Sequence, residues 1–251
     1  MLEILTHDDV TEIRLDRPPV NALNPTLVQA LNQAIAEQTA AGARALVLSG
    51  RPGLFSAGLD VPELLALDEA GMRSFWGDLF GLLERVARSP VPIAMALTGH
   101  SPAGGTVIAL FADYRVQAAG EFRLGLNEVQ VGLVVPPVIH QALSRLLGPY
   151  GAERHLVAGE MIPVEEALRI GLVDEVVPAE EAVAHAVAWC QRHLQLPARA
   201  MRATRELCRA DLAALFDDRA ALDTDAFVRG WFSAETQTTM RALVERLKKS
   251  G

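Results

Sequence analysis

The stretch Ser101-Pro-Ala-Gly-Gly-Thr-Val107 decides how this chain folds around a pocket. It follows an apolar run at 92–97, which is typical of a buried strand, and it opens an apolar helix expected over 103–111. The first turn of a helix carries free N–H groups and the positive end of the helix dipole, so it favours an anionic oxygen. Taken alone, the Gly-Gly pair is also compatible with simple tight packing.

A second glycine turn, Phe55-Ser-Ala-Gly-Leu-Asp60, lies upstream. Gly58 lets the backbone turn sharply and present the next N–H outward, although an ordinary loop glycine would look the same. Downstream, Leu126-Asn-Glu128 supplies a carboxylate between apolar neighbours. Burial would raise its pKa towards neutrality, as suits a base that must also return its proton. An exposed glutamate that caps a turn is the alternative.

Two aimed amides and one base are the minimum equipment for forming and protonating an enolate of a thioester. The sequence lacks the motifs of phosphate binding and of serine-nucleophile catalysis. No phosphate-binding glycine loop is present, and Ser56 and Ser101 have no G-x-S-x-G context. Asp60 with Glu63 offers too few oxygens for a hard cation, so no metal is expected. His100 is interpreted as a neutral, hydrogen-bonded side chain, and Asp113-Tyr114-Arg115 as a structural ion pair or turn.

Composition limits the possible partners. The chain has 251 residues, 50% of them hydrophobic and 5% aromatic, so Leu, Val and Ala build its core. A net charge of −8 argues against nucleic acid as a partner. Cys190 and Cys208 lack metal-site spacing and are expected to be reduced core or interface thiols. Neither a secretory signal nor a membrane span is recognisable, so a cytoplasmic protein without a membrane partner is expected.

Strand-like and helix-like runs alternate, which predicts parallel βαβ units and the α/β class. A hairpin is expected around His7-Asp8-Asp9, and Asn24-Pro25 opens a helix, with Asn as the cap and Pro in the first position. The expected strands are 2–5, 10–15, 45–48, 92–97, 114–117, 121–124 and 173–177, and a long helix is expected over 72–86. From about residue 136 onward, 173–177 is the one strand expected.

A boundary is predicted near Leu196-Pro197, which separates a core at 1–196 from a helical region at 197–251. The region serves in trimerisation or as a lid, or it simply completes the fold. The helices expected in it are 198–209, 212–231 and 234–249. The basic cluster Arg241…Arg246-Leu-Lys-Lys is interpreted as a solvated helix end, with a phosphate-binding rim as the alternative.

Taken together, these segments resemble the crotonase superfamily, the enoyl-CoA hydratase/isomerase fold. Val10-Thr-Glu-Ile-Arg-Leu-Asp-Arg-Pro-Pro-Val-Asn-Ala-Leu23 is similar to its opening strand and turn. The stretches at 55–60 and Gly99-His-Ser-Pro-Ala-Gly-Gly105 are similar to its two oxyanion loops. Ala167-Leu-Arg-Ile-Gly-Leu-Val-Asp-Glu-Val-Val177 is similar to the helix and strand after its core. The order of the motifs makes the match specific.

The resemblance implies a crotonase-like spiral of ββα units with a helical C-terminal region, assembled as a homotrimer or a dimer of trimers. It implies an acyl-CoA thioester substrate, whose oxygen accepts hydrogen bonds from the N–H groups of Leu59 and Gly104. No other cofactor is implied, because CoA arrives with the substrate. The residues expected along the CoA and the substrate are Ser56, Ala57, Gly58, Asp60 and Asn127.

Hydratases of this superfamily carry two glutamates, and the two matching positions here hold Val107 and Glu128. A valine cannot hold water or transfer a proton. The Ser101–Gly105 loop and the Leu126-Asn-Glu128 segment resemble those of the mitochondrial-type Δ3,Δ2-enoyl-CoA isomerases of fatty-acid β-oxidation. This resemblance implies that Glu128 moves a proton from C2 to C4. A hydratase, a thioesterase, a dehalogenase or a non-catalytic CoA-binding protein are the alternatives. Trp76, Phe80 and Trp231 either line an acyl channel or pack in the core.

Overall fold

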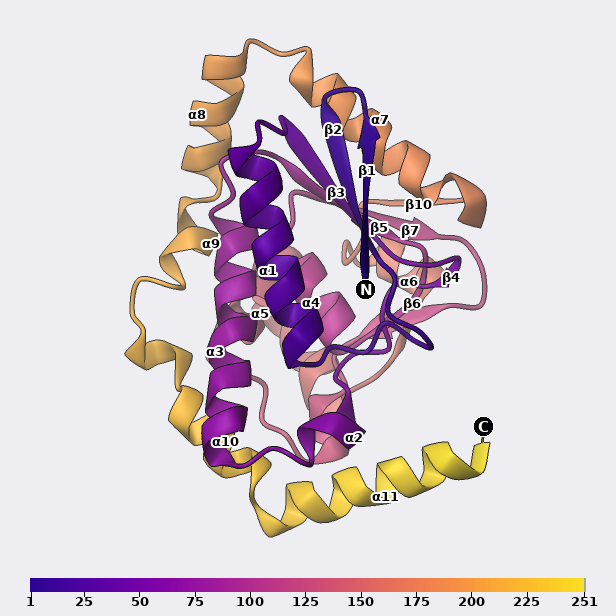
Figure 1. Cartoon of the computed structure of the whole chain (residues 1–251), viewed down its shortest axis with the longest axis vertical. Helices are drawn as coiled ribbons and strands as arrows, with labels where there is room; N and C mark the ends of the chain where they lie inside the picture. The colour runs from indigo at the N-terminus through magenta and orange to yellow at the C-terminus, as the bar shows by residue number, and fades with distance from the viewer. Residues whose placement is uncertain (251) are drawn as a thin grey trace.

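Two sheets form the frame of the protein (Figure 1). The structure, a computed structural model, describes residues 1–250, with the side chains of all of these except residues 221 and 250. Within this part, the larger sheet has six strands in the order β1-β2-β3-β5-β7-β10, and only the β1–β2 pair is antiparallel. Its strands are β1 (Leu2–His7), β2 (Val10–Leu15), β3 (Ala45–Ser49), β5 (Ile93–Leu97), β7 (Tyr114–Ala118) and β10 (Glu175–Val177).

A second, smaller sheet runs beside the first in the order β4-β6-β8-β9. Each turn of the chain places one strand in the large sheet and the next strand in the small sheet, as β3 and β4, β5 and β6, and β7 and β8 do. A helical segment then leads to the next turn, which gives the expected spiral of ββα units. The strands are β4 (Gly53–Leu54), β6 (Gly99–Pro102), β8 (Arg123–Gly125) and β9 (Ile162–Pro163).

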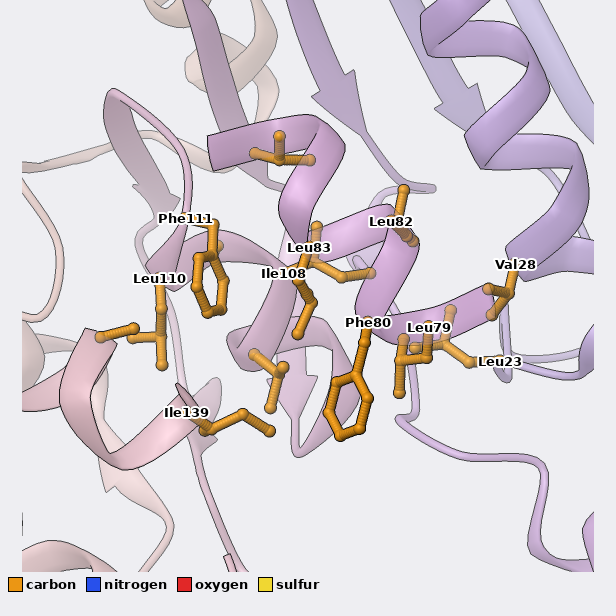
Figure 2. Close-up of a cluster of buried hydrophobic side chains, with 14 of the residues drawn as sticks. Leu23, Val28, Leu79, Phe80, Leu82, Leu83, Ile108, Leu110, Phe111 and Ile139 are labelled. Atoms are coloured by element: carbon orange, nitrogen blue, oxygen red, sulfur yellow. The ribbon is translucent and has the colours of Figure 1, made fainter. Parts of the chain in front are cut away.

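Both faces of the large sheet are covered, which explains why its central strands are apolar without alternation. On β3, Leu46 and Leu48 join the main hydrophobic cluster, whereas Ala45 and Val47 join a second cluster that includes α7 (Ala182–Leu194). Figure 2 shows part of the main cluster, where side chains such as Leu83, Ile108 and Ile139 from three helices meet. These helices are α3 (Glu69–Ala87), α4 (Gly104–Leu110) and α5 (Pro137–Ala158).

Several helices begin where the sequence predicts. Asn24 caps α1 (Pro25–Ala40) by accepting a hydrogen bond from the N–H of Leu27 at 2.8 Å, with Pro25 in the first turn. The shorter helical segments are α2 (Val61–Leu64), η1 (Glu128–Val131), α6 (Val164–Arg169) and η2 (Ala179–Glu181). The long α5 is interrupted at Gly148, next to Pro149.

The region after Pro197 is helical, and its buried apolar side chains from Leu212 onward join the main hydrophobic cluster. Its helices are α8 (Ala198–Cys208), α9 (Ala210–Ala214), η3 (Ala220–Leu222), α10 (Thr224–Trp231) and α11 (Ala234–Ser250). Phe216, Trp231 and Met240 belong to the main hydrophobic cluster, and α11 crosses the lower edge of the molecule in Figure 1. The division at residue 196 falls in the loop between α7 and α8 and stays a prediction. Gly251 lies outside the described residues.

Two expectations are corrected. The helix expected over 212–231 is broken into α9, η3 and α10, because Asp218 and Asp223 accept hydrogen bonds from nearby backbone N–H groups and favour turns. Beyond residue 136 the structure has β9 in addition to the expected strand. β4, β6 and β9 were not expected, because strands of two to four residues leave too few positions for a periodic pattern.

No helix in residues 1–250 has the length and apolar composition that spanning a bilayer takes.

The contact between the backbones of Gly99 in β6 and Gly53 in β4 leads to a stability prediction. A Cβ on Gly99 would lie 1.9 Å from the carbonyl carbon of Gly53, whereas a Cβ on the exposed helical Gly77 meets nothing within 4 Å. We expect Gly99→Ala to lower the free energy of unfolding by about 3 kcal/mol or more. Gly77→Ala, the matched control, should raise it by about 0.5–1 kcal/mol. Urea denaturation measures both, and near-wild-type stability of Gly99→Ala would contradict the close approach.

Candidate active site

A cavity of about 570 Å³ lies between the glycine turns, η1 and the C-terminal helices. Its lining changes from an exposed rim to a buried floor. Val20 and Leu247, which are 38% and 57% exposed, stand at the rim. Leu79, Ile139 and Met240 line it too and are at most 3% exposed. A ligand with one charged and one apolar end would therefore enter with the apolar end first.

The first turn brings Leu59, whose backbone N–H is unbonded within residues 1–250, to the lining of this cavity. Leu59 forms a parallel bridge with Leu23, in which the N–H of Leu23 bonds to the Gly58 carbonyl and the N–H of Asp60 bonds to the Leu23 carbonyl. Groups of successive residues point to opposite sides of an extended chain, so the Leu59 N–H faces away from Leu23. Gly58 has φ +82°, a conformation that glycine adopts without strain.

The second turn brings the start of α4 to the same place. Gly104 is the first residue of α4, and no side chain caps the helix. A Cβ on Gly58 would lie 3.6 Å from the Gly104 nitrogen, so the two turns are in direct contact. Across the described chain, neither the Leu59 nor the Gly104 N–H has a hydrogen-bond acceptor. The two amides are therefore free to bind one oxygen.

Ala103, just before α4, adopts an unusual backbone conformation, with φ 45° and ψ −115°. Such a conformation costs a non-glycine residue about 1–3 kcal/mol. Its N–H bonds to the Gly125 carbonyl at 2.7 Å, and its carbonyl accepts the N–H of Val107 at 2.8 Å. These bonds hold the turn in place and so orient the N–H of Gly104.

Glu128 is the first residue of η1 and lines the cavity. It is 9% exposed, and its Oε2 is buried without a hydrogen-bond partner in residues 1–250. Burial raises the pKa of the Glu128 carboxyl from 4.5 to about 7, and a hydrogen bond from its own backbone opposes this rise only in part. Near neutral pH the group can thus both take and return a proton.

The other carboxylate in the cavity lining is already paired. Asp60 lies 2.8 Å from the guanidinium of Arg17, and it also accepts the N–H of Glu63 at 3.2 Å as the cap of α2. Val107, on the first turns of α4, presents an apolar side chain that is 3% exposed to the same cavity. Among the described residues that line the cavity, Glu128 is therefore the carboxylate without an ion-pair partner.

The structure brings most of the predicted site residues together, with two differences. Ala57, Leu59, Asp60, Gly104, Asn127 and Glu128 all line the cavity. Ser56 and Gly58 do not. Ser56 is fully buried, where its hydroxyl donates to the Asn21 carbonyl and accepts the N–H of Gly58. Ser56 thus shapes the turn, and its side chain is not available to a ligand. The expected place of residue 56 along the CoA stays a prediction.

Other expectations concern polar residues outside the cavity. His100 accepts a hydrogen bond from the backbone N–H of Arg123 at 3.2 Å. Asp113 pairs with Arg205 at 2.7 Å and Arg115 pairs with Asp174 at 2.8 Å, so both residues form structural ion pairs, each with a partner outside the Asp113-Tyr114-Arg115 stretch. Cys190 is buried, whereas Cys208 is exposed. The described residues include no cluster of three or more His, Cys, Asp or Glu side chains able to hold a metal ion.

Sequence reasoning missed the cavity wall from the C-terminal helices. Met240, Leu243 and Leu247 of α11 line the cavity at helical spacing, and Phe227 of α10 joins them. The 3.6-residue spacing of apolar residues in α11 indicates that this helix has an apolar face, but the spacing does not identify what the face packs against. Trp76 also lines the cavity, with its ring centroid 4.0 Å from that of Phe227. The cavity lining does not include Phe80 or Trp231, which are buried in the core.

Comparisons with known proteins identify the family and the fold. A family model described as enoyl-CoA hydratase/isomerase matches residues 6–250. The human mitochondrial enoyl-CoA delta isomerase 1 is 31% identical over 245 residues, 96% of this chain and 80% of that protein. A probable enoyl-CoA hydratase of Mycobacterium avium is 33% identical over 195 residues, 76% of this chain and 74% of that protein. The crystal structure of human mitochondrial Δ3,Δ2-enoyl-CoA isomerase matches with a TM-score of 0.93 at 30% identity, over 99% of this chain and 98% of that one. The expected fold is thereby confirmed.

The raised pKa of Glu128 predicts how stability depends on pH. Between about pH 4.5 and 7 the folded carboxyl keeps its proton while the unfolded one loses it, so stability falls as the pH rises. From pH 5 to pH 8 the wild type should lose about 2–3 kcal/mol of unfolding free energy relative to Glu128→Gln, which has no such titration. Urea denaturation of both proteins at both pH values tests this. Parallel pH profiles would show that Glu128 has an ordinary pKa.

Proposed function

The chain belongs to the enoyl-CoA hydratase/isomerase family, and within it we propose that the protein is a Δ3,Δ2-enoyl-CoA isomerase. It converts 3-cis- or 3-trans-enoyl-CoA into 2-trans-enoyl-CoA. One observation carries the proposal: Glu128 is the unpaired carboxylate of a cavity that also receives two free backbone amides. Shifting a double bond needs one base and one oxyanion site, which is what this cavity offers.

The cavity suggests how the substrate binds. The CoA phosphates, which are charged, stay at the exposed rim near Val20 and Leu247, and the acyl chain extends towards the buried floor. Trp76 and Phe227 then contact the acyl chain. The thioester lies between the two ends, where its carbonyl oxygen accepts hydrogen bonds from the N–H groups of Leu59 and Gly104.

Proton transfer proceeds in two steps. Glu128 removes a proton from C2, and the C–H electrons form the C1–C2 double bond of a dienolate, with the negative charge on the thioester oxygen. The Leu59 and Gly104 amides stabilise this oxygen, each by about 3 kcal/mol. Protonated Glu128 then delivers the proton to C4, the 3,4 double bond moves to the 2,3 position, and the carbonyl is restored. No atom is gained or lost, so the reaction needs no cofactor besides the CoA of the substrate.

A pKa of about 7 suits this role of Glu128. A carboxylate with the usual pKa would be a weak base towards C2 and would release its proton to C4 at little cost. A much higher pKa would leave the group protonated before the reaction. A value near the working pH balances the two transfers.

Hydratase activity is the main alternative, because probable hydratases are among the relatives. In the hydratases of the superfamily that this chain resembles, a second glutamate occupies the position that matches Val107. The valine side chain borders the cavity and offers no polar atom to hold or activate a water molecule. The valine therefore favours isomerisation over hydration. A thioesterase or a dehalogenase would also find no second polar group at this position. A non-catalytic CoA-binding protein would have no need of the buried carboxylate of Glu128.

We also propose the assembly and location that the resemblance implies. The protein forms a homotrimer or a dimer of trimers and acts in the cytoplasm on acyl-CoA thioesters of fatty-acid β-oxidation. Size-exclusion chromatography with light scattering tests the assembly.

Replacing the base tests the mechanism. Glu128→Gln should lower kcat for 3-hexenoyl-CoA by about 10²–10⁴-fold, because the amide cannot take the C2 proton. The appearance of conjugated-enoyl absorbance measures the rate. Glu121→Gln makes the same chemical change on an exposed residue and serves as the matched control. Activity of Glu128→Gln within a few-fold of wild type would overturn the assignment of Glu128 as the base.

The ratio of two activities tests the role of Val107. Wild-type protein should hydrate crotonyl-CoA at least about a hundredfold more slowly than it isomerises 3-hexenoyl-CoA, since general acid–base assistance by a second carboxylate is worth about 10²–10⁴-fold. Loss of conjugated-enoyl absorbance measures hydration. Comparable rates for the two reactions would favour a hydratase instead.

A further inference from the structure

No side chain of another described residue fixes the position of the Glu128 carboxyl group, which has a hydrogen bond only from its own backbone. Oε2 has no hydrogen-bond partner in the described part of the chain, and no arginine, lysine or histidine pairs with this side chain there. The direction of the side chain therefore depends on the backbone that carries it, which is the single 3-10 turn η1. A 3-10 turn this short has few bonds of its own, so what holds η1 also places the carboxyl.

A partly buried hydrogen bond joins the end of η1 to another element. Gly132 ends η1 with φ 76° and ψ 19°, and the N–H of Leu133 returns to the Glu128 carbonyl at 2.9 Å. The Gly132 carbonyl accepts a hydrogen bond from the hydroxyl of Thr236 at 2.6 Å. Thr236 lies in the first turn of α11 and is fully buried.

The approach of α11 to η1 is close along the backbone as well. A Cβ on Gly132 would lie 3.2 Å from the Cα of Thr236. Ser233, just before α11, fixes the Thr236 hydroxyl, since its own hydroxyl donates to it at 3.0 Å and accepts the Thr236 N–H at 3.2 Å. The Thr236 hydroxyl proton is therefore directed to the Gly132 carbonyl.

η1 also packs against the end of α5. A Cβ on Gly159 would lie 2.6 Å from a methyl group of Val129, so the Val129 side chain lies close against the Gly159 backbone. η1 thus has a packing contact at Val129 and a hydrogen bond from Thr236. Of the two, the hydrogen bond comes from the helix whose residues Met240 and Leu243 also form the cavity wall.

We propose that Thr236 is a positioning residue for Glu128, through which α11 fixes the carboxylate relative to the amides of Leu59 and Gly104. The proposal rests on the role of Glu128 in the proposed function. It makes α11 part of the proton-transfer machinery in addition to a wall of the cavity. Loss of the hydroxyl leaves η1 free to shift, and a displacement of about 1 Å of a catalytic group can lower a rate by up to about 10²-fold.

The test compares Thr236→Val, which keeps the shape and loses the hydroxyl, with Thr236→Ser, which keeps the hydroxyl. We expect Thr236→Val to lower kcat for 3-hexenoyl-CoA about tenfold with KM changed less than twofold, and Thr236→Ser to retain at least half of kcat. Thr239→Val is the matched control, because its hydroxyl bonds only to the Glu235 carbonyl within α11. All rates are divided by the folded fraction measured by urea denaturation.

A double-mutant cycle separates positioning from a general structural effect. If Thr236 acts through Glu128, adding Thr236→Val to Glu128→Gln should change the residual rate less than twofold. An equal tenfold loss in both backgrounds, or a wild-type kcat in Thr236→Val, would overturn the inference. Those results would leave the proposed function intact as long as Glu128→Gln is inactive. High activity of Glu128→Gln alone would overturn the proposed function instead.

Discussion

The burial of the Glu128 carboxyl without an ion-pair partner is the constraint on which the rest of the site depends. Burying a charged carboxylate in an apolar cavity is unfavourable, and this raises the pKa of the Glu128 carboxyl to about 7. A nearby arginine would stabilise the charged carboxylate and so lower its pKa, which would make Glu128 a weaker base. The one arginine in the described cavity lining, Arg17, is instead engaged by Asp60 and Glu63. The charges around the cavity are therefore arranged so that Glu128 remains without a counter-ion.

The two backbone amides depend on close packing between glycines. A Cβ on Gly58 would lie 3.6 Å from the Gly104 nitrogen, and a Cβ on Gly104 would lie 2.5 Å from the side chain of Leu23. Because side chains are missing here, the turn at Leu59 can lie against the first turn of α4, where free N–H groups are available. The strained Ala103 and its bond to Gly125 belong to the same arrangement, since they fix the direction in which α4 begins.

The sequence predicted the parts of the fold that have strong local signals. Asn24-Pro25 marked a helix start correctly, and the apolar runs at 45–48 and 92–97 proved to be central strands. The glycine turns and Glu128 were placed by motif order, and the structure brings them to one cavity. The small sheet was not predicted, because strands as short as β4 and β9, with two residues each, show no alternation of apolar and polar residues. The role of Ser56 was missed because its partner, Asn21, is distant in sequence, and the wall from α11 depends on tertiary packing that periodicity does not encode.

The order in which the cavity wall appears along the chain affects biosynthesis. Both glycine turns and Glu128 precede residue 130, whereas Met240, Leu243 and Leu247 belong to α11, which is translated after every other described element. Domains begin to fold while the ribosome is still extending them. A nascent chain that has already folded its sheets would leave the apolar floor of the cavity, which includes Leu79 and Ile139, open on the side that α11 later covers.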